Sequence, residues 1–123
     1  RSTLFPYTTL FRSEIYTITS ILESISTIVL QSFHVDVQDN YDFDRFLIHC
    51  RFFVQRIVNA EAGVHHSTAN QAIFQMMKEQ SIQQYACVNQ IAEMLEKKYE
   101  YFVNDEEKLY FLIHLNKLTK DSV

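Results

Sequence analysis

Glycine and proline are nearly missing from this chain of 123 residues. It holds one Gly, Gly63, one Pro, Pro6, and no Trp. Sheets and hairpins need Gly, Pro and similar residues between their strands, so this shortage argues against a β-rich fold. We therefore expect an all-α domain, and the length suffices for one small domain with a single core.

Long apolar runs and paired cysteines are lacking as well. No apolar run approaches the length that a membrane-spanning helix needs, so we expect no membrane partner. Cys50 and Cys87 form no CxxC motif, and both lie among apolar residues. The pattern favours two buried free thiols of a cytoplasmic protein over a disulfide or a pair of metal ligands.

The first thirteen residues differ from the rest of the chain. The stretch RSTLFPYTTLFRS holds the sole Pro, no acid, no amide and no sustained period, and it fits neither a secretory signal nor a transit peptide. Residues 3–13 resemble the in-frame translation of a common short-read sequencing adapter. We expect residues 1–13 to be non-native and residues 14–120 to form the natural domain, which would be truncated at about Glu14.

Basic residues are in deficit once this segment is set aside. Without Arg1 and Arg12, nine of the eleven basic residues remain against fifteen acidic residues, and the formal net charge falls from -4 to -6. Contact with phosphate backbones normally needs a basic face. We therefore expect no direct nucleic-acid binding by this fragment.

Apolar residues at helical spacing predict the first two helices. Residues 14–33 space their aliphatic side chains at three and four, which indicates the first helix. Asp39, Asn40 and Asp42 offer N-caps for a second helix, which would end near Ala60. The second helix carries a complete apolar stripe.

Three further helices follow a loop that contains Gly63. Ser67 or Thr68 would cap a short third helix, and Ser81 would cap the fourth. In the fifth, Asn104 as N-cap and Glu107 at the third helical position resemble a capping box. No internal repeat or low-complexity segment interrupts this pattern.

Three of the five histidines suggest no special chemistry. His65 and His66 lie in the Gly-containing loop, where solvated polar residues are more common than metal ligands, and no cysteine or acidic cluster completes a metal site. His34 ends the first helix, where an imidazole can cap carbonyl groups. We therefore expect no metal site.

His49 lies at the margin of the apolar stripe of the second predicted helix. On a helical wheel, Asp42, Arg45 and Arg56 fall on the same margin. The sequence thus places an acid, two bases and an imidazole along the border of the core.

His114 lies within LYFLIHL on the fifth predicted helix. It shares one helical face with Tyr110, Phe111 and Leu118, so we expect it to be largely buried and hydrogen-bonded. From spacing alone, structural roles are favoured for His49 and His114. The chain has no GxSxG, no HExxH, no phosphate loop and no paired carboxylate in an apolar setting, so we expect no catalytic residue and no cofactor.

Two segments change this balance because they carry a family resemblance. RFLIHCRFFVQRI contains His49, and NDEEKLYFLIHLNKL contains His114, about 65 residues later. Both resemble the histidine-bearing segments of the PTS regulation domain (PRD) of BglG/LicT-type transcription antiterminators. The likeness runs across essentially all of residues 14–119. The FFVQR element after His49 resembles the second of the two PRDs in that family.

This resemblance implies a five-helix regulatory domain that forms homodimers and is not an enzyme. The histidines that match His49 and His114 are phosphorylation sites of the phosphotransferase system in that family, and the second PRD typically receives phosphate from the carrier HPr. Arg45, Arg51 and Arg56 are then candidates to support a phosphohistidine. No further cofactor is implied.

Other functions stay open at this point. One is a PRD from a DNA-binding transcriptional activator, which carries the same module beside a different output domain. Another is a helical dimerisation module with purely structural histidines, and a third is a small metal-binding or hydrolytic helical protein.

Overall fold

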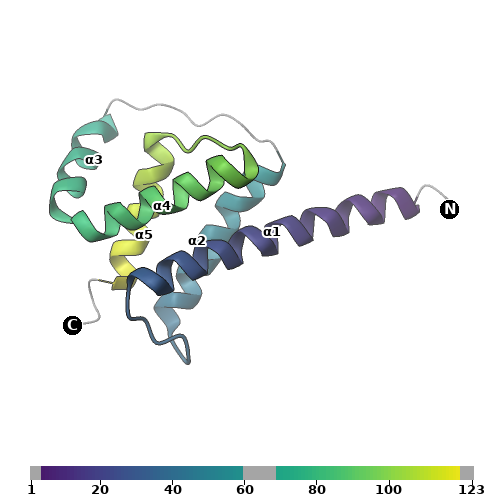
Figure 1. Ribbon diagram of the computed structural model, residues 1–123, viewed down its shortest axis with the longest axis horizontal. Coiled ribbons are helices and arrows are strands. Elements are labelled where there is room, and N and C mark those ends of the chain that lie inside the picture. Colours follow the sequence, from purple (N-terminus) through teal and green to yellow (C-terminus); the bar gives the residue numbers. More distant parts are fainter. Residues whose placement is uncertain (1–3, 60–68, 120–123) are drawn as a thin grey trace.

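Five helices make up the part of the chain that the structure describes, which is residues 4–59 and 69–119 of a computed structural model (Figure 1). They are α1 (Leu4–Ser32), α2 (Tyr41–Val58), α3 (Ala69–Gln80), α4 (Ile82–Tyr99) and α5 (Asp105–Thr119). No strand occurs in these described ranges. The predictions of an all-α fold and of five helices are confirmed.

The start of α1 differs from the prediction. The helix begins at Leu4, whereas the sequence pattern placed its start at Glu14. Pro6 falls in the first turn, where its missing N–H group costs no helical hydrogen bond, so nothing in this stretch stops the helix. Figure 1 shows the first turns of α1 projecting away from the other helices.

The predicted caps of α2 and α5 are confirmed. The Asn40 side chain accepts a hydrogen bond of 2.9 Å from the Phe43 N–H group at the start of α2. At the start of α5, the Glu107 N–H group donates to Asn104 Oδ1 at 2.9 Å. The Asn104 N–H group in turn donates to Glu107 Oε1 at 3.0 Å, which completes a capping box.

The predicted cap of α4 is only half right. Ser81 does precede the helix, but its hydroxyl makes no capping hydrogen bond. It accepts instead from Asn116 Nδ2 at 3.0 Å, and so connects the α3–α4 junction to α5. The proposed caps of α3, Ser67 and Thr68, lie outside the described residues, as do His65 and His66.

All five helices contribute to the core, which has few polar side chains. α1 packs on α2 and α4, α5 packs on α2, α3 and α4, and α3 also packs on α4. The largest fully buried side chains include Phe53 of α2 and Phe111 of α5, whose ring centroids lie 4.5 Å apart. This aromatic contact fixes α2 against α5, the two helices that carry His49 and His114.

Both cysteines are buried and unpaired, as predicted. Burial raises the pKa of Cys50 and of Cys87, because an apolar environment disfavours the thiolate. Neither thiol is therefore set up as a nucleophile.

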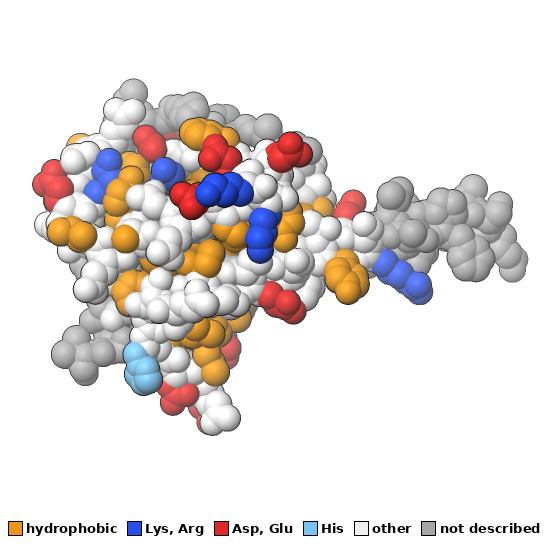
Figure 2. Space-filling view, in the orientation of Figure 1, with side chains coloured by type: hydrophobic (Ala, Val, Ile, Leu, Met, Phe, Trp, Pro, Cys, Tyr) orange, Lys and Arg blue, Asp and Glu red, His pale blue; other side chains and the backbone are white. Residues whose placement is uncertain are grey.

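On the surface, charges of both signs mix with apolar side chains on the face shown in Figure 2. None of the helices within residues 4–59 and 69–119 is long and apolar enough to cross a membrane. The same residues contain no group of three or more His, Cys, Asp or Glu side chains that could hold a metal ion.

Candidate functional site

His49 and His114 lie against each other where α2 packs on α5. Their ring centroids are 4.0 Å apart and their planes differ by 18°, so the two imidazoles are stacked. Both side chains are half-buried. The packing of two helices therefore joins into one site the two histidines that the sequence separates by about 65 residues.

Tyr110 holds this histidine pair in place. Its ring lies edge-on to His114 with centroids 4.6 Å apart, and it is one turn earlier on α5. Its hydroxyl donates a 3.0 Å hydrogen bond to the backbone carbonyl of His49 on α2. The sequence placed Tyr110 only as a neighbour of His114, because the bond to α2 depends on how the two helices pack.

The environment of His114 favours its neutral form. Burial, together with the nearby His49 and Lys117, lowers the pKa of His114 to about 4. At neutral pH this imidazole is therefore uncharged and keeps a nitrogen lone pair.

One expectation for His114 is wrong. It was expected to be largely buried and hydrogen-bonded, but it is half-buried. Among the described residues, neither its imidazole nor that of His49 has a hydrogen-bond partner; ring contacts hold both. The ring nitrogens are thus not engaged in fixing the fold.

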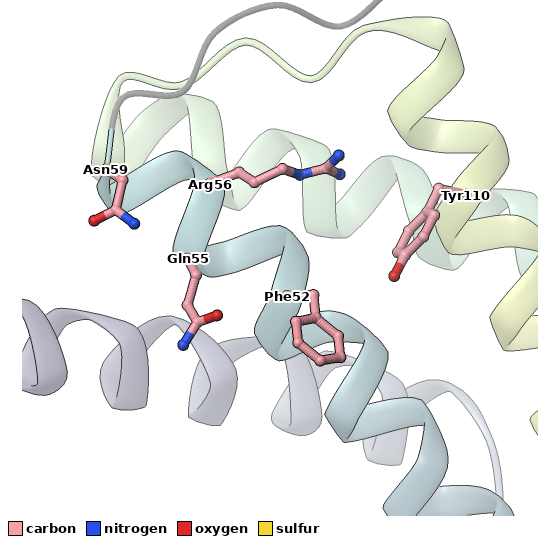
Figure 3. A pocket seen from close by; sticks show the side chains of 5 residues that line it. All are labelled: Phe52, Gln55, Arg56, Asn59 and Tyr110. Carbon is pink, nitrogen blue, oxygen red and sulfur yellow. The ribbon is translucent and has the colours of Figure 1, made fainter.

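A cavity of about 290 Å³ opens between α2 and Tyr110. It is lined by Phe52, Gln55, Arg56, Asn59 and Tyr110 (Figure 3). Figure 3 shows the Arg56 side chain pointing toward Tyr110, and the guanidinium carbon lies 5.9 Å from the ring centroid of Tyr110. Arg56 and the two histidines therefore lie around the same tyrosine.

The other two predicted arginines are placed differently. Arg45 is one turn before His49 on α2, and its guanidinium lies 4.9 Å from the ring centroid of Tyr41. The hydrogen bond and the electrostatic interaction with Tyr41 raise the pKa of Arg45, which stays charged. Arg51 is exposed and stands two residues after His49, about 200° around the helix. The structure thus brings Arg45 and Arg56 to the side of His49 and does not bring Arg51 there.

His34 is not part of this site. It is exposed and follows α1, in the connection to α2. Of the histidines in the described ranges, only His49 and His114 come together.

Comparison with known protein families shows which family carries these two helical segments. The model of the PRD domain family matches residues 19–118. The chain belongs to the PRD family. The two signature segments of this PRD are the α2 and α5 segments whose histidines stack in the structure.

Two curated relatives are antiterminators. This PRD is 28% identical over 109 residues to the transcription antiterminator LicT of Bacillus subtilis (strain 168). It is 23% identical over the same length to the beta-glucoside operon antiterminator of Dickeya chrysanthemi. Each match covers 88% of this chain and 38% of the relative, so the chain spans well under half the length of the curated relatives it matches. The chain is thus a regulatory domain of the type found in these antiterminators.

Proposed function

We propose that this PRD accepts phosphate on the His49–His114 pair from the carrier HPr of the phosphotransferase system and so regulates a sugar operon. The observation that carries the proposal is the stacking of these two imidazoles, 4.0 Å apart and without hydrogen-bond partners among the described residues. A histidine with a structural role would normally use its ring nitrogens to bond neighbouring groups. Within the described residues, the ring nitrogens of His49 and His114 make no such bonds, which supports the proposed acceptor role.

The transfer balances with the residues in place. A lone pair of the acceptor imidazole attacks phosphorus, and a new P–N bond forms as the P–N bond of the carrier breaks. The electron pair of the broken bond returns to the imidazole of the carrier. One proton leaves the acceptor ring and the carrier ring gains one through solvent. The low pKa of His114 ensures that its lone pair is available at neutral pH.

Phosphorylation would change the charge of this site sharply. A phosphoryl group adds about two negative charges at neutral pH. Arg56 lies beside Tyr110, whose ring contacts both histidines, and Arg45 stands on the same side of α2, so these two arginines are the candidates to pair with the phosphoryl group. We further propose that the domain acts as a homodimer and that this added charge shifts the dimer population.

Phosphate labelling tests the proposal. The chain is incubated with phosphoenolpyruvate, the general transferase of the system and HPr. We expect a label that is labile in acid and stable in base, as a P–N bond requires. His49→Ala should reduce the label and the double variant with His114→Ala should abolish it, whereas His34→Ala, the matched control, should retain it. Size-exclusion chromatography with light scattering before and after labelling reports the dimer.

Label that persists in the double variant would contradict the proposal. So would a complete lack of label on the wild-type chain while HPr itself is phosphorylated. Either result would assign His49 and His114 a structural role.

A further inference from the structure

Tyr110 of α5 carries a hydroxyl group in a place that a purely apolar ring would fill. Its ring centroid lies 6.5 Å from that of Phe53 and 6.3 Å from that of Phe111. Both phenylalanines are fully buried, and a hydroxyl group buried beside them costs free energy unless it finds a partner. Burial raises the pKa of Tyr110, so the hydroxyl keeps its proton and acts as a donor.

The partner of this hydroxyl is the backbone of one of the two histidines. Tyr110 donates its 3.0 Å hydrogen bond to the carbonyl group of His49. His49 lies inside the continuous helix α2, in which this carbonyl also pairs with the N–H group four residues later, that of Phe53. A carbonyl oxygen has two lone pairs, so it accepts both bonds. The tyrosine bond is therefore not needed to satisfy α2. Its effect is to fix α5 against the peptide group that carries the His49 imidazole.

The same side chain contacts the second histidine. Tyr110 precedes His114 by one turn of α5, and the two rings meet at 67° with centroids 4.6 Å apart. Within the described residues neither imidazole has a hydrogen-bond partner of its own, so ring contacts and the packing of α2 on α5 set the distance between them. Tyr110 thus joins the backbone of one histidine to the ring of the other.

We propose that Tyr110 is a positioning residue for phosphate transfer, whose hydroxyl fixes the register of α5 on α2 at His49 and so keeps the two imidazoles stacked. The inference rests on the proposed function and adds the residue that orients the acceptors. Attack on phosphorus needs an aligned lone pair, and a displacement of about 1 Å can cost roughly a hundredfold in rate. The hydroxyl bonds a backbone carbonyl and not a ring nitrogen, so it acts through position alone.

Tyr110→Phe tests this role because it keeps the ring and removes only the hydroxyl. The matched control is Tyr99→Phe, since the Tyr99 hydroxyl lies 3.1 Å from Ser20 Oγ and joins α4 to α1 instead of α5 to α2. The first measurement is the rate of labelling as a function of the concentration of phosphorylated HPr, which gives the maximal rate and the half-saturating concentration. The second is the NMR spectrum of the unphosphorylated protein, in which stacked imidazoles shift each other's ring protons by their ring currents.

We expect Tyr110→Phe to lower the maximal rate about tenfold, because the remaining packing limits the displacement, and to leave the half-saturating concentration as in the wild type. The ring-current shifts should shrink as the stack loosens. Tyr99→Phe should match the wild type in all three quantities.

An unchanged maximal rate in Tyr110→Phe would overturn the proposal, and a higher half-saturating concentration at that rate would assign Tyr110 to carrier binding instead. Equal losses in the two variants would overturn it too, because the loss of any hydrogen bond between helices would then have the same effect. Failure of the proposed function looks different, because the wild-type chain would then take up no label. The ring-current shifts of Tyr110→Phe would still decide whether the hydroxyl holds the stack.

Discussion

At the scale of single residues, the proposed phosphate transfer depends on the few ring contacts that hold the two imidazoles. His114 touches His49 through its face and Tyr110 through the tyrosine edge, and these contacts remove water without supplying hydrogen bonds within the described residues. Loss of water disfavours the charged ring, and the nearby His49 and Lys117 add to this effect. An imidazole in this setting is uncharged at neutral pH, as the proposed phosphate acceptor must be.

The lowered pKa of His114 predicts a pH dependence of stability. The pKa is about 4 in the folded chain and 6.5 without the fold, so the unfolded state binds more protons between these values. The free energy of unfolding should therefore fall as the pH falls from 6.5 to 4, and His114 should add no further loss below pH 4. Urea unfolding of His114→Gln at several pH values should show a shallower fall than the wild type.

The control for this effect is His34→Gln, which changes an exposed histidine. Its pH dependence should follow the wild type. If His114→Gln and the wild type lose stability in parallel across this window, the histidine pair is not the desolvated group that the geometry indicates.

At the scale of elements, α4 ends without the glycine that usually follows a helix. The last turn of α4 ends at Glu100, which has a φ of 54° and a ψ of 35°, in the left-handed region that glycine usually occupies. The N–H groups of Glu100 and Tyr101 donate to the carbonyl groups of Glu96 and Leu95, respectively, so this conformation satisfies two carbonyl groups of the last turn. The conformation nevertheless costs a residue with a Cβ atom about 1 kcal/mol.

Glu100→Gly should therefore stabilise the domain. Removing the Cβ atom relieves the left-handed conformation, and we expect a gain of about 0.5–1 kcal/mol in the free energy of unfolding. Urea unfolding at neutral pH measures it. Glu96→Gly, one turn earlier in the regular helix, should instead lose about 1 kcal/mol. Equal destabilisation by the two changes would contradict this account of the α4 terminus.

The start of α1 supports a second test at this scale. We propose that residues 1–13 are not part of the natural domain. The ribbon of the first turns of α1 projects away from the other helices (Figure 1). Deletion of residues 1–13 should change the melting temperature by less than a few degrees, which corresponds to under about 1 kcal/mol in a domain of this size.

Deletion of residues 1–21 provides the matched control. It also removes Ile21, which is completely buried, and should destabilise the domain strongly. A large loss on deleting residues 1–13 alone would show that the projecting turns belong to the fold.

At the scale of the whole molecule, the sequence predicted the helices better than their contacts. Local signals such as the Asn40 cap and the Asn104–Glu107 capping box depend on neighbouring residues, so they could be found. The helical wheel also placed His49 at the border of the core. The stacking on His114 could not be derived from either segment, because it depends on the depth and register at which α2 packs on α5.

Other misses follow from the same limit. Ser81 was predicted as a cap from local sequence, but its hydroxyl bonds to Asn116 on a distant helix. Glu107 does more than cap α5, because its second carboxylate oxygen accepts a hydrogen bond from the Tyr101 hydroxyl. With burial as the larger cause, this bond raises the pKa of Tyr101. Long-range partners of polar side chains are set by tertiary packing, which one sequence does not encode locally.

The central claim is that His49 and His114 form one phosphate-accepting site. The most direct test is to map the phosphate by mass spectrometry, at neutral pH, on the wild-type chain after incubation with phosphorylated HPr. We predict phosphate on His49, on His114 or on both, and none on His34, His65 or His66. Phosphate confined to those other three histidines would contradict the claim.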